Sequence, residues 1–123
     1  PWESGVGAAN GFNTTGLSWL PQPEIYAEYA RDRQDGVAGS TLELYKSALR
    51  IRRELKLGEG SFDWLPEYTD AQTLGYRNGD VIVVHNFGEA AISMPSGELL
   101  LRSAGDASDG SKIEPHETVW VRG

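Results

Sequence analysis

The strongest hydrophobic pattern in the chain lies in residues 41–56, where apolar side chains recur at the spacing of a helix. Projected at about 100° per residue, they cover about half of the helix circumference, whereas a surface helix usually buries a narrower stripe. We therefore expect this helix to pack against neighbours on two sides. Arg52 falls within the apolar half, so its guanidinium should reach solvent or find a carboxylate. The apolar positions are Leu42, Leu44, Tyr45, Ala48, Leu49, Ile51 and Leu55.

Capping residues set the expected ends of this helix. Ser40, followed three residues later by Glu43, has the pattern of a capping box, and Gly58 supplies the expected stop. A shorter helical segment is expected to begin at Pro23 and to run through Tyr29, because proline suits the first turn of a helix. The glycines that follow it are expected to end it.

Residues 61–123 alternate between strand-like runs and turns, with no helical pattern between them, which favours an antiparallel sheet or sandwich. The Asn78-Gly79 step is a strong hairpin signal, because both residue types tolerate positive φ. The run Val81–Val84 is apolar on both faces, as expected of a central strand. The expected strands are Phe62–Leu65, Thr73–Arg77, Val81–Phe87, Ala90–Met94, Leu99–Ser103 and Thr118–Arg122.

Residues 1–22 differ from the rest because they show no periodicity. They are rich in Gly, Asn, Thr and Pro, with isolated aromatic residues at Trp2, Phe12 and Trp19. Irregular segments of this length are uncommon inside compact proteins, and they usually line a site or have lost their surroundings. The chain begins at Pro1 without an initiator Met or a leader pattern, so we expect the natural N-terminus to be missing.

Composition excludes several classes of partner. Eleven basic and eighteen acidic residues give a net charge of −7, and the basic residues of 46–56 lie among glutamates, so nucleic acid is not an expected partner. No apolar run approaches the roughly 20 residues that span a bilayer, so no transmembrane helix is expected. The chain has no cysteine, which removes disulfides, zinc–thiolate sites and thiol nucleophiles, and favours a cytoplasmic protein.

Catalytic chemistry finds little support in the residue pattern. Glycoside hydrolysis needs two carboxylates across the scissile bond, and no acidic residue has an unusual setting. His85 falls inside an expected strand and is interpreted as a core residue, whereas His116 follows a proline in a turn and should be exposed. The histidines lack metal-ligand spacing and the serines lack a nucleophile elbow, so no metal and no cofactor are expected. The acidic residues interpreted as solvated surface charges are Asp106, Asp109, Glu89, Glu98 and Glu117.

Four tryptophans could stack on sugar rings, although core or interface packing explains each of them as well. Trp2 and Trp19 are the better candidates for sugar contact, because they lie in the irregular N-terminal segment, whereas Trp64 and Trp120 lie in expected strands. The segment Asp106–Ser111 has a superficial likeness to a calcium loop but lacks the late bidentate glutamate, so we interpret it as a turn.

The order of several short motifs resembles α-glucosidases and oligo-1,6-glucosidases of the α-amylase superfamily, which are enzymes of the glycoside hydrolase family 13 type. The resemblance is strongest over residues 1–57, moderate over 58–87 and weaker beyond. An Asn-Phe step like Asn86-Phe87 is frequent in those enzymes. The motifs are Pro1-Trp2-Glu3, Gly11-Phe12, Trp19-Leu20-Pro21, Ser40-Thr41-Leu42, Tyr45-Lys46 and Leu49–Arg53.

The resemblance implies an α+β fragment. Residues 1–57 would be the last loop and helix of a (β/α)₈ barrel, and residues 58–123 an antiparallel, β-sandwich-like C-terminal domain. A complete barrel needs about 250 residues, so the catalytic carboxylates would lie upstream of Pro1, and this chain alone should be inactive. The parent enzyme would cleave α-glucosidic bonds of small sugars with retention. The barrel would pack on helix 41–56, and without it the fragment is expected to self-associate.

The resemblance also places the N-terminal segment near the mouth of the substrate pocket, because barrel enzymes build their sites on the loops after the strands. Trp2, Glu3 and Phe12 are the candidates for the rim of that pocket. An oligosaccharide substrate would bind only in the parent enzyme. No catalytic residue is expected within this chain.

Three alternatives remain open at this stage. Trehalose synthases and sucrose-active transglycosylases have similar tails, so the parent reaction could be a transfer. A stand-alone carbohydrate-binding β-sandwich would need aromatic residues aligned on one exposed face. An interaction domain without enzymatic activity would also explain a wide apolar helix face. The aromatic residues that decide the second alternative are Trp64, Tyr68, Tyr76 and Trp120.

Overall fold

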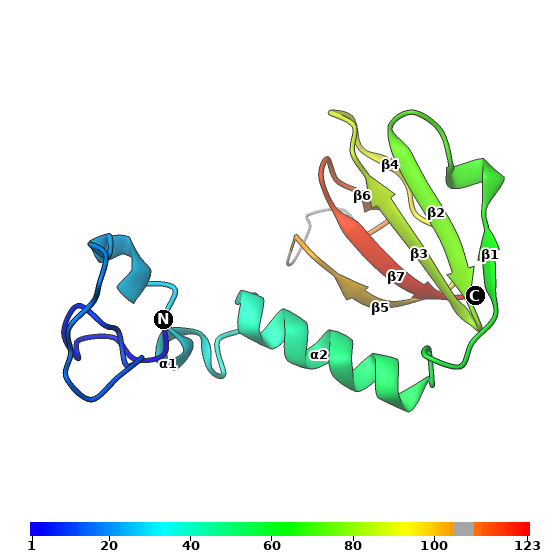
Figure 1. Ribbon diagram of the computed structural model, residues 1–123. Coiled ribbons are helices and arrows are strands. Elements are labelled where there is room, and N and C mark those ends of the chain that lie inside the picture. The colour runs from blue at the N-terminus through cyan, green and yellow to red at the C-terminus, as the bar shows by residue number, and fades with distance from the viewer. Residues whose placement is uncertain (105–109) are drawn as a thin grey trace. The chain divides into compact units, whose positions relative to one another are not determined.

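The computed structural model describes residues 1–104 and 110–123, so Asp106 and Asp109 lie outside the described residues. The chain forms two compact units, Pro1–Tyr45 and Lys46–Gly123 (Figure 1). Irregular segments and short helices make up the first unit, and antiparallel sheets make up most of the second. The predicted fold class is therefore confirmed. The predicted division between residues 57 and 58 rests on the resemblance and stays a prediction.

In the first unit, residues 1–22 contain neither helix nor strand, as predicted. The expected short helical segment is present as a 3₁₀ helix, Glu24–Ala27, which starts directly after Pro23. A short helix, α1 (Arg31–Gln34), follows it. Three residues of this unit are buried: Ala9, Asn10 and Ala30.

Helix α2 spans Thr41–Glu54, and its start differs in one detail from the prediction. The Ser40 hydroxyl accepts a hydrogen bond from the Glu43 N–H at 3.3 Å, which is the expected N-cap. The Glu43 carboxylate does not return to the Ser40 N–H, which donates to the Val37 carbonyl instead. The Glu43 carboxylate accepts a hydrogen bond from the Gly36 N–H at 2.9 Å instead. The capping box is therefore half formed, and Glu43 orders the preceding turn.

The C-terminal end of α2 is a Schellman motif centred on Lys56, not on the predicted Gly58. Lys56 has a φ of 52°, in the left-handed region that favours glycine. Its N–H donates to the Arg53 carbonyl at 3.2 Å, and the Leu57 N–H donates to the Arg52 carbonyl at 3.0 Å. Gly58 has another role, because a Cβ there would lie 3.2 Å from the Arg52 guanidinium. Arg52 is exposed, as one of the two predicted outcomes requires.

The strands of the second unit form a five-stranded and a two-stranded antiparallel sheet. The order in the large sheet is β1-β2-β3-β7-β5, which Figure 1 shows from the edge at β1 to the edge at β5. A 3₁₀ turn, Pro66–Tyr68, lies between β1 and β2. The strands are β1 (Phe62–Trp64), β2 (Thr73–Asn78), β3 (Val81–Asn86), β4 (Ile92–Ser93), β5 (Glu98–Arg102), β6 (Lys112–Ile113) and β7 (Thr118–Arg122).

All six predicted strands are present, although 90–94 shrinks to the two residues of β4. Strand β6 was missed because two residues are too few to show an alternating pattern. The hairpin between β2 and β3 lies one residue later than predicted, because Asn78 pairs with Val81 and leaves Gly79 and Asp80 in the loop. Of these two, only Gly79 has a positive φ, so a glycine at the first loop position makes this turn.

The main buried cluster of the second unit lies on one face of the large sheet, and Val81 and Val83 are buried on the opposite face. Inward side chains of β3 and β7 form a buried cluster with Ile113 of the small sheet. Ile92 and Met94 pack against this cluster, so the small sheet covers the large one and makes the domain sandwich-like. The buried members are Ile82, Val84, Ile113, Val119 and Val121.

The strained end of α2 leads to a stability prediction. Lys56→Gly should raise the free energy of unfolding by about 0.5–1 kcal/mol, because glycine adopts the left-handed conformation without a steric penalty. Urea denaturation followed by circular dichroism measures it. Arg53→Gly is the matched control, since a glycine inside an exposed helix should lower stability by about 1 kcal/mol. Equal effects of the two substitutions would show that backbone strain at Lys56 is unimportant.

Candidate functional site

The N-terminal segment folds back on itself around Asn10. The Asn10 carbonyl accepts hydrogen bonds from the Trp2 N–H at 2.8 Å and from the Glu3 N–H at 3.1 Å. Gly11 has a φ of 81°, and a Cβ at that position would lie 3.1 Å from the Glu3 backbone nitrogen. A glycine is therefore required there, both for its conformation and for the close approach. This turn places Phe12 beside the Trp2–Glu3 segment.

Helix α1 anchors the same segment from the other side. The Arg31 N–H donates to the Pro1 carbonyl at 3.1 Å, and the Asp32 N–H donates to the Trp2 carbonyl at 3.2 Å. The Ser4 N–H and hydroxyl both donate to the Asp32 carboxylate, the hydroxyl at 2.8 Å. The Ser4 backbone hydrogen bond, followed by that of its hydroxyl, lowers the pKa of the Asp32 carboxyl. Trp2 is thus held by main-chain contacts on two sides.

The structure brings the three predicted rim residues together. The rings of Trp2 and Phe12 meet edge to face, with centroids 6.3 Å apart. Both rings line an apolar hollow of about 480 Å³ with Leu42 and Tyr45. Phe12 also borders a second hollow of about 550 Å³, which is polar and includes Glu3. The predicted role of these residues at a substrate pocket is not tested by this geometry and stays a prediction.

Neither hollow has the two carboxylates that glycoside hydrolysis needs. Within the part of the chain that the structure describes, Glu3 is the one carboxylate that lines either hollow, whereas the reaction needs two. Across residues 1–104 and 110–123, no group of three or more His, Cys, Asp or Glu side chains could hold a metal ion. No helix among the described residues is long and apolar enough to cross a membrane.

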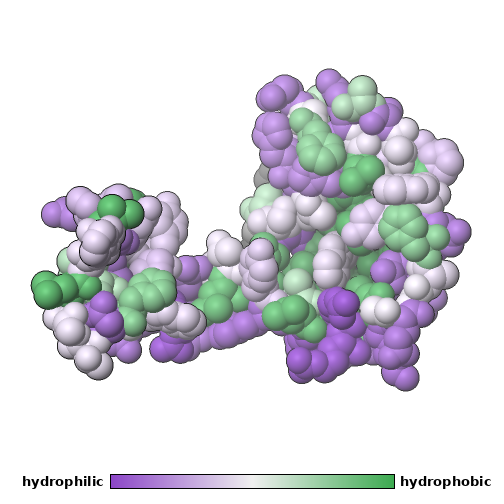
Figure 2. Space-filling view, in the orientation of Figure 1, coloured by the Kyte–Doolittle hydropathy of each residue, from purple (hydrophilic) through white to green (hydrophobic). Residues whose placement is uncertain are grey.

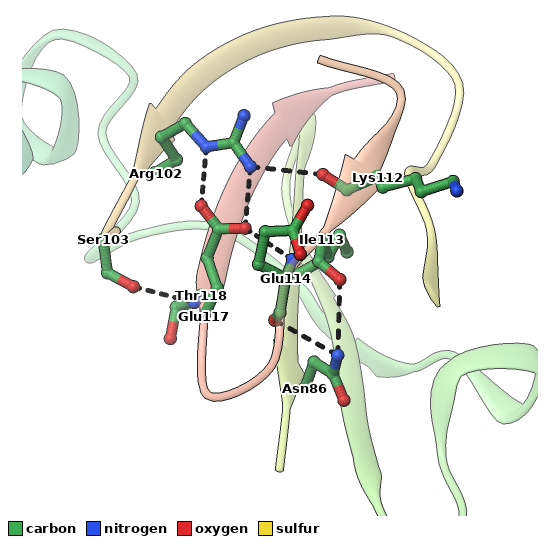
Figure 3. A network of polar contacts seen from close by, with 8 residues as sticks. All are labelled: Asn86, Arg102, Ser103, Lys112, Ile113, Glu114, Glu117 and Thr118. Atoms are coloured by element: carbon green, nitrogen blue, oxygen red, sulfur yellow. Dashed lines mark hydrogen bonds and ion pairs between the residues drawn. The ribbon is translucent and has the colours of Figure 1, made fainter. Parts of the chain in front are cut away.

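Polar residues of the second unit form a buried network that the sequence analysis missed (Figure 3). Glu117 is fully buried, not a solvated surface charge as predicted. Arg102 donates to both of its carboxylate oxygens, from Nε at 2.6 Å and from Nη2 at 2.7 Å. The Glu114 N–H donates to Glu117 at 2.8 Å, and Arg102 Nη2 also donates to the Lys112 carbonyl at 3.2 Å. The pair therefore connects β5 and β7 of the large sheet with β6.

A pattern in the sequence could have revealed this burial. Glu117 is separated by two and four residues from Val119 and Val121, whose side chains point into the core. Residues two apart in an extended chain point to the same side, so Glu117 continues the inward row. Arg102 pairs with Val119 across the β5–β7 ladder and lies on that same face. A basic partner, which a buried carboxylate needs, was therefore present at the matching position of the neighbouring strand.

Asn86 makes a second buried connection between the sheets (Figure 3). Its Nδ2 donates to the carbonyls of Ala90, Ile113 and Glu114 at 2.8, 3.3 and 3.1 Å. Its Oδ1 accepts a hydrogen bond from the Gly88 N–H at 2.9 Å. Asn86 and Glu117 together hold residues 112–117 to the large sheet. The role of this network is structural, because every polar group of the two side chains has a partner within the domain.

The two histidines and the two exposed glutamates of the sequence analysis lie in the second unit. His85 is half-buried in β3, with Nδ1 2.6 Å from the Thr118 hydroxyl, and His116 is exposed, as predicted. Glu98 is exposed beside Arg122 at 3.5 Å, and Glu89 is exposed beside His116 at 3.6 Å, which confirms the surface interpretation for both glutamates.

The aromatic residues of the large sheet divide between its two faces. Trp64, Tyr76 and Trp120 share one face, because Trp64 pairs with Tyr76, and Val83 pairs with both Tyr76 and Trp120. Tyr68 does not join them, since it packs against the core cluster on the other face. Three of the four aromatic residues that a sugar-binding face would need are therefore aligned.

The fold of this chain is found within larger enzymes that act on sugars. An isomaltulose synthase mutant from Erwinia rhapontici NX5, solved with D-glucose, matches with a TM-score of 0.74 and 20% identity, over 99% of this chain and 24% of that chain. Trehalose-6-phosphate hydrolase from Bacillus licheniformis matches with a TM-score of 0.71 and 22% identity, over 98% of this chain and 24% of that chain. At these identities the likeness is one of fold.

Sequence comparison leads to the same group of proteins. The chain is 26% identical over 128 residues to the salivary α-glucosidase of Aedes aegypti, covering 98% of this chain and 21% of that protein. It therefore spans about a fifth of the length of the curated relative that it matches. No family model matches the chain. The predicted resemblance to α-glucosidase-like enzymes of the α-amylase superfamily is confirmed by sequence and by fold.

The buried pair predicts a large loss of stability when one charge is removed. Glu117→Gln should lower the free energy of unfolding by about 3–5 kcal/mol, because it removes the charged carboxylate of a buried ion pair. Urea denaturation measures the change. Glu98→Gln is the matched control, since its pair with Arg122 is exposed and should contribute at most about 1 kcal/mol. Similar losses in the two variants would contradict the assigned role.

The same pair predicts a pH dependence of stability. Burial alone would raise the pKa of the Glu117 carboxyl, but hydrogen bonds from Arg102 and the Glu114 N–H, and the Arg102 charge, hold the pKa below its ordinary value of 4.5. Because the folded pKa is lowered, this stabilisation is complete above pH 4.5 and is lost as the pH falls through the folded pKa. Urea midpoints measured down to pH 3 should fall less steeply in Glu117→Gln than in the original chain. Parallel pH profiles would contradict this.

Proposed function

We propose that this chain is a non-catalytic part of a glycoside hydrolase whose complete polypeptide cleaves α-glucosidic bonds of small sugars with retention of configuration. One observation carries the proposal: 98% of the chain matches an α-glucosidase, yet the match covers only 21% of that enzyme. A (β/α)₈ barrel of about 250 residues would supply the catalytic carboxylates. In this account the chain by itself has no activity, and its sheets stabilise the enzyme.

The exposed apolar side chains of the first unit and of α2 support a role in binding the barrel. Tyr45 and Leu49 are one helical turn apart on α2 and are 64% and 58% exposed. Trp2 and Phe12, also more than half exposed, line the apolar hollow together with Tyr45. Figure 2 shows apolar residues at the surface of each unit. Burying a large apolar side chain contributes about 1.5–3 kcal/mol, so the catalytic domain would gain stability from this surface.

The N-terminal segment would then contribute to the mouth of the substrate pocket. Phe12 lies between an apolar and a polar hollow, and Glu3 provides a carboxylate on the polar side. An aromatic ring next to a hydrogen-bonding group suits a sugar, which has both apolar and hydroxyl-bearing surfaces. We therefore keep Trp2, Glu3 and Phe12 as rim residues of the parent enzyme. The absence of cysteine supports a cytoplasmic location.

Transglycosylation is the second candidate for the parent reaction. Its support is the fold likeness to an isomaltulose synthase, which is as extensive as the likeness to a hydrolase. Both reactions pass through a glycosyl-enzyme intermediate in retaining enzymes and differ in whether water or a sugar accepts the glycosyl group. The part of the polypeptide that would choose the acceptor lies mostly outside this chain.

The proposal predicts a contrast in activity. The 123-residue chain should not hydrolyse p-nitrophenyl α-glucoside, whereas the polypeptide encoded by the complete reading frame should hydrolyse it and release α-glucose first, as NMR of the anomeric proton shows. Product analysis with sucrose as substrate separates hydrolysis from transfer. A reading frame that opens at Pro1, without a barrel before it, would contradict the proposal.

The isolated chain should also self-associate in sedimentation velocity, because its apolar surface lacks a partner.

A further inference from the structure

The first unit has little apolar core, so hydrogen bonds decide where its N-terminal segment lies. Three of its residues are buried, and two of these are alanines. Packing of so few small side chains constrains the main chain weakly. The positions of Trp2 and Glu3, two of the predicted rim residues, therefore depend on the polar groups that bind their main chain.

Asp32 of helix α1 binds the main chain on both sides of Glu3. On the N-terminal side, the Asp32 N–H donates to the Trp2 carbonyl at 3.2 Å. On the C-terminal side, the Ser4 N–H donates to both oxygens of the Asp32 carboxylate, at 3.1 and 3.0 Å. The Ser4 hydroxyl donates to the same carboxylate at 2.8 Å. One residue, 28 positions away from Ser4 in the sequence, thus brackets Glu3.

The charge of Asp32 strengthens this bracket. Hydrogen bonds to a charged acceptor are stronger than those between neutral groups. The Ser4 N–H bond, followed by the Ser4 hydroxyl bond, lowers the pKa of the Asp32 carboxyl, so the carboxylate is charged at neutral pH. Arg33 Nε donates to the Ser4 hydroxyl oxygen at 3.0 Å, which directs the hydroxyl proton toward Asp32.

The turn at Asn10 holds Glu3 from the other side. The Glu3 N–H donates to the Asn10 carbonyl at 3.1 Å, and Gly11 approaches the Glu3 backbone closely. The Glu3 main chain is therefore fixed between the turn and Asp32, while Glu3 lines the polar hollow. The resulting arrangement is an ordered carboxylate with an ordered aromatic neighbour, Trp2.

We propose that Asp32 is a positioning residue for the substrate pocket of the complete enzyme, which holds Trp2 and Glu3 in place without contacting the substrate itself. This inference rests on the proposed function. A segment that is ordered before binding loses less conformational freedom when the sugar binds, so the affinity for the sugar is higher. Loss of the bracket should weaken substrate binding more than the chemical step, because the catalytic carboxylates would belong to the barrel.

Steady-state kinetics of the complete polypeptide with p-nitrophenyl α-glucoside test this role. Asp32→Ala should raise KM about five-fold and change kcat by less than about two-fold, because uniform binding energy is lost. Ser4→Ala removes the hydroxyl bonds but keeps the N–H bond, so it should raise KM by a smaller factor. Ser4→Thr retains the hydroxyl and should restore the original KM.

Asp70→Ala is the matched control. Asp70 is also an exposed carboxylate that accepts three hydrogen bonds, from the Gln72 N–H, the Thr73 N–H and the Thr73 hydroxyl at 2.7, 2.8 and 3.0 Å. It lies in the second unit and binds no part of the N-terminal segment. Its loss should leave KM unchanged, even where both variants lower the melting temperature.

Each outcome supports or overturns a stated claim. An active polypeptide whose KM is the same with and without Asp32 would overturn this inference and leave the proposed function intact. Equal increases of KM in Asp32→Ala and Asp70→Ala would also overturn it, since lost stability would then explain both. If Asp32→Ala does not fold, the Ser4 variants decide: equal KM values in Ser4→Ala and Ser4→Thr would overturn the inference. A complete polypeptide without hydrolytic activity would overturn the proposed function, and this inference with it.

Discussion

Uncovered apolar surface is the physical constraint on which the account of this chain depends. Trp2 and Phe12 in the first unit, and Phe62 and Trp64 in the second, are each more than half exposed. Water contact with side chains of this size costs free energy that burial would recover, at about 25 cal/mol per Å² of apolar area. Each unit exposes such side chains, so each would gain stability from a partner surface. A larger catalytic domain, of the kind found in the matched enzymes, would provide it.

The second unit is held together by interactions of a different kind. Its apolar core is small, and the short strands β4 and β6 contribute few main-chain hydrogen bonds of their own. The Arg102–Glu117 pair and the Asn86 amide supply directed contacts from the large sheet to the β6–β7 connection. These contacts satisfy buried polar groups, so breaking one of them leaves a costly charge or carbonyl inside the domain. The packing of the small sheet on the large one therefore depends on directed polar contacts as well as on hydrophobic burial.

Much of the fold could be predicted from the sequence because its main elements carry clear periodic signals. The run of apolar residues in 41–56 gave helix α2, and Val81–Val84 gave the central strand. The failures have local physical causes. Lys56 adopts a left-handed conformation that favours glycine, and the Glu43 carboxylate is used by the Gly36 N–H instead of the helix N-cap. Glu117 was misjudged because its charge was weighed without the inward position that it shares with Val119.

The candidate site was predictable only in part. The order of the motifs identified Trp2, Glu3 and Phe12 as candidates. The structure shows that the turn at Asn10 and Gly11 places Phe12 close to Trp2 and Glu3. Their role at a substrate pocket stays a prediction, because under the proposed function most of that pocket would be built by a catalytic domain outside this chain. The stacking of Phe62 on Tyr76 was also difficult to foresee, because these two residues become neighbours only through the β1–β2 register.

Hydrogen–deuterium exchange of the α2 amides tests the central claim most directly. If the helix was shaped to lie against a catalytic domain, the amides of residues 41–54 should exchange at least ten-fold more slowly in the complete polypeptide than in the 123-residue chain. Equal exchange rates in the two proteins, with the β3 and β7 amides equally protected in both, would contradict the claim that this chain is one part of a larger enzyme.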